Sequence, residues 1–139
     1  MALPRPCVSA AVLHEDALDY TPVPSSVGLA RSRAARLVSG WGHPGIAGDA
    51  ALVVGELAAN AVLHGSVRGR LFRVRLTLTA SAVRIEVSDA RGERRPEVGS
   101  PSGDEKSGRG MVIVDALAAR WGVLPRTVGK TVWAELDLR

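Results

Sequence analysis

Two stretches of alternating apolar and polar residues stand in the middle of the chain. In residues 71–80, LFRVRLTLTA, every second residue from Phe72 is apolar, and residues 82–90, AVRIEVSDA, repeat the pattern. A period of two places the apolar side chains on one face of a strand. The polar residues between them indicate that the other face meets water, which is typical of an antiparallel sheet. We therefore predict two strands with one buried face.

Three other segments show the spacing of helices. Residues 25–42 open with serines suited to an N-cap and then place apolar residues three and four apart. A second helix is predicted from about residue 46 to residue 64, where Gly65 would end it. A third is predicted over residues 111–122, MVIVDALAARWG. Each would bury one side against the predicted strands.

The two ends of the chain complete the fold prediction. Residues 1–20 read as a proline-containing arm with a weakly indicated strand near residues 10–20, and residues 121–139 as two strands with a turn near 127–129. Residues 21–139 would then form one domain. Its class would be α+β, a two-layer sandwich with helices on one face of a mixed or antiparallel sheet.

Composition narrows the functional classes. Of the 139 residues 46% are hydrophobic, which is enough to fill one core and excludes a disordered chain. The single cysteine, Cys7, permits no internal disulfide and no cysteine-based zinc site. The N-terminus lacks a secretory pattern, and no segment is expected to approach the length needed to span a membrane. These features predict a cytoplasmic protein.

The charge balance is basic but dispersed. The net charge is +4 and the pI is about 10.2. Basic residues number 18 against 14 acids and lie along the whole chain, without the interleaved aromatic residues that stack nucleobases. Direct binding to nucleic acid is therefore only a third alternative, which would need a steep salt dependence to support it.

Residues 90–110 differ abruptly from their surroundings. The segment ARGERRPEVGSPSGDEKSGRG contains glycine, proline, serine and charge, and almost nothing that a core would bury. A loop of this length inside a compact domain is often a functional lid. By composition alone, a disordered surface insertion is the more frequent explanation.

The predicted second helix carries a polar stripe. Glu56 and Asn60 are one turn apart among apolar neighbours, and His64 follows one turn later. A buried carboxylate needs a partner, and a hydrated Mg²⁺ accepts oxygen ligands from a carboxylate or an amide. Taken alone, residues 56–65 favour a hydrogen-bond network at the helix end without a ligand.

Three further candidates lie at the ends of elements. Asp89 ends a predicted strand and could accept a hydrogen bond from an exocyclic amine, or could simply begin a turn. Gly108 and Gly110 enclose Arg109 just before the predicted third helix, as a phosphate cradle or a loop hinge. Thr131 begins the last predicted strand and could share the polar contact of Asp89, or could reflect strand propensity alone.

Taken in order, these motifs resemble those of a known family. The combination ELAANAVLH, VSDA, GRGMVIVDALAARWGV and GKTVWAEL, within residues 20–138, is similar to the Bergerat-type ATP-binding fold of histidine kinases and gyrase. It looks most like the small single-domain branch of anti-sigma-factor serine/threonine kinases. This resemblance implies the cofactors ATP and Mg²⁺, the metal being bound through Asn60.

The resemblance also assigns roles to the candidate residues. Glu56 would be the catalytic base that orients the attacking hydroxyl or water. Asp89 would bind the adenine amino group with support from Thr131, and Gly108, Arg109 and Gly110 would close over the phosphates. His64 would cap or pack the helix end. One departure stands out, because Arg91 occupies the position of the first glycine in the family's Asp-x-Gly-x-Gly box and Gly92 comes one residue late.

By this resemblance the chain would be a regulator that phosphorylates a serine or threonine of a small antagonist protein. It would also bind a sigma factor in a partner switch, and so regulate transcription, with a homodimer as a further expectation. The altered glycine box keeps a second function open, a nucleotide-binding module that holds a partner without phosphoryl transfer.

Overall fold

The computed structural model describes residues 11–90 and 105–138, with the side chains of 105–110 outside the description. The described residues form five strands and three helices. In order these are β1 (His14–Tyr20), α2 (Pro24–Gly40), α3 (Pro44–His64), β2 (Phe72–Leu78), β3 (Ala82–Asp89), α4 (Glu105–Leu117), β4 (Arg120–Pro125) and β5 (Lys130–Asp137).

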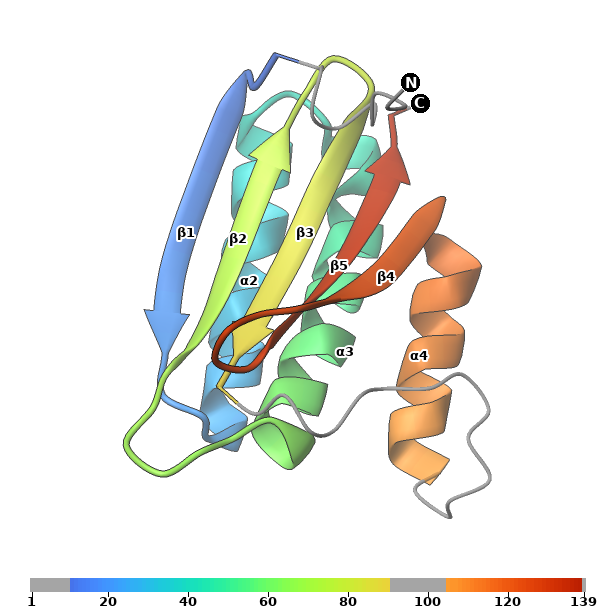
Figure 1. Cartoon of the computed structure of the whole chain (residues 1–139). Coiled ribbons are helices and arrows are strands. Elements are labelled where there is room, and N and C mark those ends of the chain that lie inside the picture. Colours follow the sequence, from blue (N-terminus) through green and yellow to red (C-terminus); the bar gives the residue numbers. More distant parts are fainter. Residues whose placement is uncertain (1–10, 91–104, 139) are drawn as a thin grey trace, which may run out of the picture.

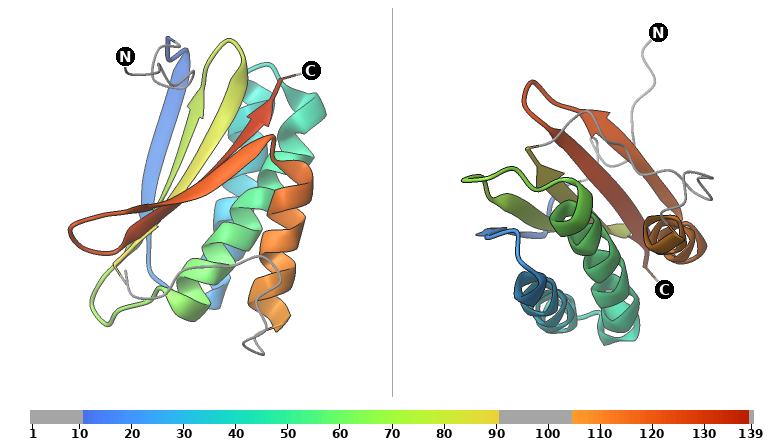
Figure 2. Two further views of the ribbon diagram at one scale, coloured as in Figure 1. Left: turned by 45° about the vertical axis from the view of Figure 1, so that its right-hand side comes forward. Right: turned by 90° about the horizontal axis from the view of Figure 1, so that it is seen from below.

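The elements stack in two layers (Figure 1). The strand order is β1-β2-β3-β5-β4, and every neighbouring pair is antiparallel. All three helices cover the same face of the sheet, and the opposite face carries none of the described helices, as Figure 2 shows from two further directions. The prediction of an α+β sandwich with helices on one face is therefore confirmed.

The core lies between the sheet and the helices. Alternate residues of β2 and β3, such as Val74, Leu76 and Ile85, are at most 5% exposed, as the sequence alternation predicts. The central helix α3 faces them with Val53 and Leu57. Burial of one such side chain contributes about 1.5–3 kcal/mol, so this interface supplies most of the driving force for the fold.

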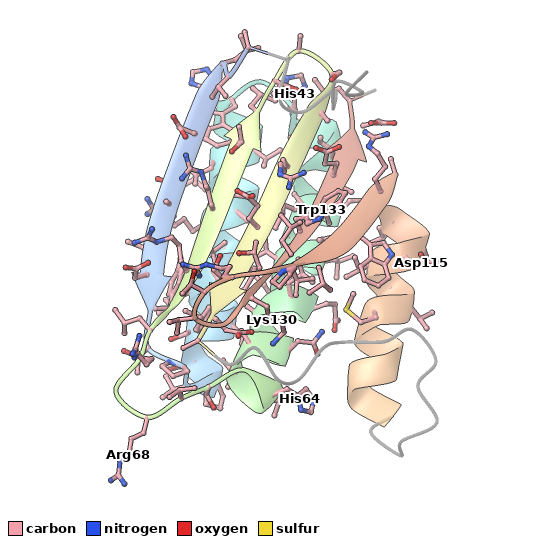
Figure 3. All side chains as sticks on the ribbon, viewed as in Figure 1. His43, His64, Arg68, Asp115, Lys130 and Trp133 are labelled. Carbon is pink, nitrogen blue, oxygen red and sulfur yellow. The ribbon has the colours of Figure 1, made fainter. Side chains whose placement is uncertain are left out.

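The uncovered face of the sheet is polar rather than apolar. Glu135 accepts hydrogen bonds from Arg84 (3.0 Å) and Arg120 (2.8 Å). The Arg84 guanidinium lies 4.4 Å from the ring centre of Trp133, a residue of β5 that is labelled in Figure 3. Burial of Glu135 opposes its ionisation, but the hydrogen bonds and charges of the two arginines outweigh burial and lower the pKa of this carboxyl. Paired charges thus allow this face to meet water without a covering layer.

Strand β1 confirms the weakly indicated strand in the N-terminal arm. It pairs with β2 along its whole length, so residues 14–20 belong to the sheet. Asp16 accepts two hydrogen bonds from Arg33 of α2 (2.7 and 2.9 Å), and His14 stacks on Trp41 with ring centres 5.6 Å apart. These long-range contacts, which local sequence does not encode, fix the edge strand.

Helix α4 differs from its prediction at both ends. It begins at Glu105 rather than at residue 111, and it ends at Leu117, so that Arg120 and Trp121 belong to β4. Pairing explains the second difference, because Arg120 and Trp121 lie opposite Glu135 and Ala134 of β5. The ladder with β5 prevails over the helical spacing of residues 118–122.

The expectation that no segment is long enough for a membrane span is wrong for α3. Its 21 residues pass that test by length and apolar composition, although half of the tested window is buried inside the domain. A core helix of a soluble protein passes the same test, and α3 packs against α2, α4 and the sheet (Figure 2).

Candidate functional site

The polar stripe of α3 faces the seam between α3 and α4. Glu56 and Asn60 are half-buried, between the buried neighbours Leu57 and Ala61. The Asn60 amide nitrogen donates to the sulfur of Met111 on α4 at 3.3 Å, and Met111 is fully buried. The stripe therefore lies against α4 and does not point freely into solvent.

This amide is suited to a metal that prefers oxygen. With its nitrogen on the Met111 sulfur, Asn60 presents its oxygen on the other side of the amide. Mg²⁺ takes few protein ligands and completes its shell with water and phosphates. Within the described part of the chain no three His, Cys, Asp or Glu side chains gather into a metal cluster. Asn60 would thus hold such an ion together with a phosphate-bearing ligand.

Asp89 lies on the helix-facing side of the sheet, at the end of β3. Its carboxylate is 5% exposed and accepts a hydrogen bond from Lys130 Nζ at 2.9 Å, and the lysine side chain is also 5% exposed. The two residues are opposite each other in the β3–β5 ladder. Figure 3 shows Lys130 at the same end of the domain as His64, the last residue of α3.

Two glycines bring backbone against Asp89. A Cβ on Gly65, the residue after α3, would overlap the Asp89 carboxylate. A Cβ on Gly129 would overlap the Asp89 carbonyl oxygen, and Gly129 also has a φ of +82° that disfavours other residues. The end of α3 thereby approaches the carboxylate of Asp89, and the β4–β5 turn approaches its backbone.

Thr131 does not share the polar contact of Asp89. It is next to Lys130 on β5, and successive strand residues point to opposite faces of a sheet. The Thr131 hydroxyl lies 2.7 Å from the Ser88 hydroxyl on the side away from the helices. The expected Asp89–Thr131 contact is therefore wrong, and Lys130 takes that place.

The glycine pair expected ahead of a helix lies inside it. Gly108, Arg109 and Gly110 belong to α4, which begins at Glu105. Their placement in a loop before the helix N-terminus is thus corrected, while a role toward phosphates stays a prediction. Most of the predicted lid, residues 91–104 with Arg91 and Gly92, lies outside the described residues.

His64 is half-buried in the last turn of α3. The backbone N–H of Gly65 bonds the Ala61 carbonyl and closes this helix end. The packing or capping role expected for the imidazole stays a prediction.

Sequence reasoning missed Lys130, Gly65 and Met111 as parts of the site. Lys130 had a signal, since it adjoins Thr131 in the motif already chosen and strand alternation assigns it to the other face. The contact between Met111 and Asn60 joins residues 51 positions apart, which helix spacing cannot reveal.

A comparison with protein families matches residues 20–136 to the model of the histidine kinase-like ATPase domain. The chain belongs to this family. Domains of the histidine kinase-like ATPase family bind ATP, generally with Mg²⁺, and the two-layer sandwich agrees with the fold of such a domain.

Solved structures agree on the fold. One match is the histidine kinase domain from the Erythrobacter litoralis EL346 blue-light activated histidine kinase, with a TM-score of 0.55 and 20% sequence identity. The alignment covers 83% of this chain and 60% of that chain, so the histidine kinase-like ATPase domain described here spans about three fifths of that structure. No curated protein matches the chain.

Proposed function

We propose that this domain binds ATP with Mg²⁺ and transfers the γ-phosphoryl group to a serine or threonine of a small antagonist protein. In this proposal the domain also binds a sigma factor, and phosphorylation of the antagonist decides which partner it holds. The cytoplasm is the compartment that supplies ATP and both partners. The observation that carries the proposal is the half-buried Glu56–Asn60 stripe beside α4, within a histidine kinase-like ATPase domain.

The residues of α3 suit the steps of phosphoryl transfer. The acceptor hydroxyl oxygen forms a bond to the γ-phosphorus, the bond from that phosphorus to the bridging oxygen breaks, and ADP leaves. Glu56 would take the proton of the hydroxyl, and Asn60 would hold a Mg²⁺ that supplies neutralisation of the phosphate charge. Asn60 positions the ion through its amide oxygen. Most of the catalysis is then orientation and charge neutralisation.

The opposite end of the ligand would lie at Asp89. The adenine amino group donates to this carboxylate beside Lys130, which is already bonded to it. The first two turns of α4, with Gly108, Arg109 and Gly110, cover the phosphates. Thr131 contributes only through its neighbour Ser88, because it faces the other side of the sheet.

The test of the catalytic role separates binding from transfer. We expect Glu56→Gln to bind ATP with Mg²⁺ like the wild type but to lose transfer of labelled phosphate to a cognate antagonist protein. Glu86→Gln, a carboxylate on the uncovered face of the sheet, is the matched control and should transfer normally. Undiminished transfer by Glu56→Gln would refute this role for Glu56.

A second function is supported by the Asp89–Lys130 pair. Because the lysine already occupies the carboxylate, and because Arg91 replaces the first glycine of the family's box, the domain can serve as a partner-binding module without phosphoryl transfer. Labelled ATP incubated with the cognate antagonist distinguishes the two. If the domain captures its partner protein equally with and without phosphorylation of the antagonist, this result supports a partner-binding module.

Sedimentation of the same samples tests the expected homodimer.

A further inference from the structure

A hollow of about 250 Å³ opens on the uncovered face of the sheet, at the end where β3 stops and β2 begins. Its walls come from four separate parts of the chain, the end of β1, the start of β2, the end of β3 and the β4–β5 turn. Ser88 and Arg73 point to this face, opposite the helix-facing Asp89–Lys130 pair. The hollow therefore opens on the side of the sheet away from the α3 stripe.

Three arginines line this hollow. Arg73 is held by Asp19, which accepts its hydrogen bonds at 2.7 and 3.2 Å. Arg70 and Arg126 line the same space and have no hydrogen bond or ion pair through their side chains among the residues that the structure describes. The lining contains two acids, Asp19 and Asp89. Only Asp19 faces the hollow with its carboxylate, because the Asp89 carboxylate is buried against Lys130.

The charge count therefore leaves two guanidinium groups without a counter-charge. The hydrogen bond from Arg73 lowers the pKa of Asp19, so the pair stays ionised and neutral overall at pH 7. Arg70 and Arg126 supply the excess of two positive charges, and Ser88 adds a hydroxyl to the lining. A phosphate monoester carries between −1.5 and −2 charges at pH 7 and is bound bidentately by arginine.

The hollow continues into an apolar neighbour. A second depression of about 510 Å³ shares Arg70 and Leu71 with it and is lined by Val23 and Val67. Leu71 is 55% exposed and therefore offers an apolar surface at the junction of the two spaces. A free phosphate would leave this second space unused, whereas a polypeptide could fill it with the side chains that flank a phosphorylated residue.

We propose that these two hollows bind a phosphorylated serine or threonine segment of a partner protein, with the phosphate between Arg70 and Arg126. Apolar residues beside the phosphorylated position then pack on Leu71 and Val67. The site would thus recognise a phosphate group attached to another protein chain. This recognition does not require nucleotide binding.

The experiment uses the whole chain and four probes in isothermal titration calorimetry at 150 mM salt. The probes are a pentapeptide Ala-Leu-phosphoserine-Leu-Ala with blocked ends, the same peptide without phosphate, O-phosphoserine and inorganic phosphate. We expect the phosphopeptide to bind most tightly, with at least tenfold weaker binding of the unphosphorylated peptide. Arg70→Ala and Arg126→Ala should each weaken phosphopeptide binding about tenfold or more, since each removes hydrogen bonds to a charged group.

Arg36→Ala is the matched control, because it removes an exposed arginine from α2 on the other layer. It should leave phosphopeptide binding within twofold of the wild type. Equal losses in all three variants would show a nonspecific charge effect and overturn the proposal. So would absence of phosphopeptide binding by wild type, or equal affinity for inorganic phosphate and the phosphopeptide. Circular dichroism of each variant confirms that the fold is intact, since the altered side chains are exposed.

Discussion

Lys130 Nζ lies 2.9 Å from Asp89 Oδ2, and both side chains are 95% removed from water. The pair joins the end of β3 to the start of β5 at the point where α3 and the β4–β5 turn both end. The carboxylate that the family resemblance assigns to adenine is thus already bonded inside the protein. Any ligand amine must share it with the lysine.

Removal of the lysine alone should destabilise the domain. Lys130→Met leaves the buried Asp89 carboxylate without its ammonium partner, which typically costs about 3–5 kcal/mol. We expect a correspondingly lower free energy of unfolding in urea at pH 7.

The double variant Asp89→Asn with Lys130→Met is the control. It removes both charges and keeps similar volumes, so its free energy of unfolding should lie much closer to that of the wild type. A double variant as unstable as the sum of the single changes would contradict a coupled buried pair.

Gly129→Ala tests the close approach to Asp89. Gly129 and Gly69 both have positive φ, +82° and +79°, but only Gly129 has backbone next to its missing Cβ. Gly69→Ala should cost about 1–2 kcal/mol for the left-handed backbone alone. Gly129→Ala should cost clearly more because the new methyl group overlaps the Asp89 carbonyl. Equal melting temperatures of the two variants would exclude the close contact.

The cluster around Glu135 should make stability sensitive to acid. Its pKa in the folded state lies below the ordinary value of 4.5, so its contribution is full above pH 4.5 and declines as the pH falls through the folded-state pKa. Glu135→Gln should therefore lower the free energy of unfolding at pH 7 and make its decline between pH 5 and pH 3 shallower. Urea titrations at several pH values measure both effects.

Asp137→Asn provides the comparison for this cluster. Asp137 also pairs with Arg120, but its side chain is 57% exposed. Exposed pairs contribute about 0–1 kcal/mol, so this variant should unfold almost like the wild type. A loss as large as that of Glu135→Gln would show that the position within the cluster does not matter.

The variant Asn60→Ala tests whether the domain binds ATP through a Mg²⁺ held by Asn60. ATP and Mg²⁺ at a hundred times the dissociation constant should stabilise the wild type by about 2.7 kcal/mol, a rise of several degrees in Tm. Asn60→Ala should lose the Mg²⁺-dependent part of this rise. Because the change also removes the Met111 contact, Met111→Leu serves as a control that keeps the amide and should retain the rise. A wild type without any rise would exclude nucleotide binding.

Much of the architecture follows from local patterns. The alternation from Phe72 to Leu78 and from Val83 to Val87 predicts which strand face is buried. Successive side chains point to opposite faces, so only one orientation of each strand buries its apolar residues. Gly65 likewise marks the end of α3. The boundary of α4 and β4 escaped prediction, since residues 118–122 suit a helix locally and only pairing with β5 makes them a strand.

The sequence by itself determined the two-layer fold, the polar stripe of Glu56 and Asn60, and the position of Asp89 at a strand end, because each depends on spacing within one element. Only the tertiary structure decided which side chains contact one another. Lys130 rather than Thr131 meets Asp89, Met111 holds the Asn60 amide, and Arg70 and Arg126 line one hollow. The Lys130–Asp89 and Met111–Asn60 contacts, and the hollow shared by Arg70 and Arg126, join residues 41 to 56 positions apart. Only packing and strand register bring such residues together.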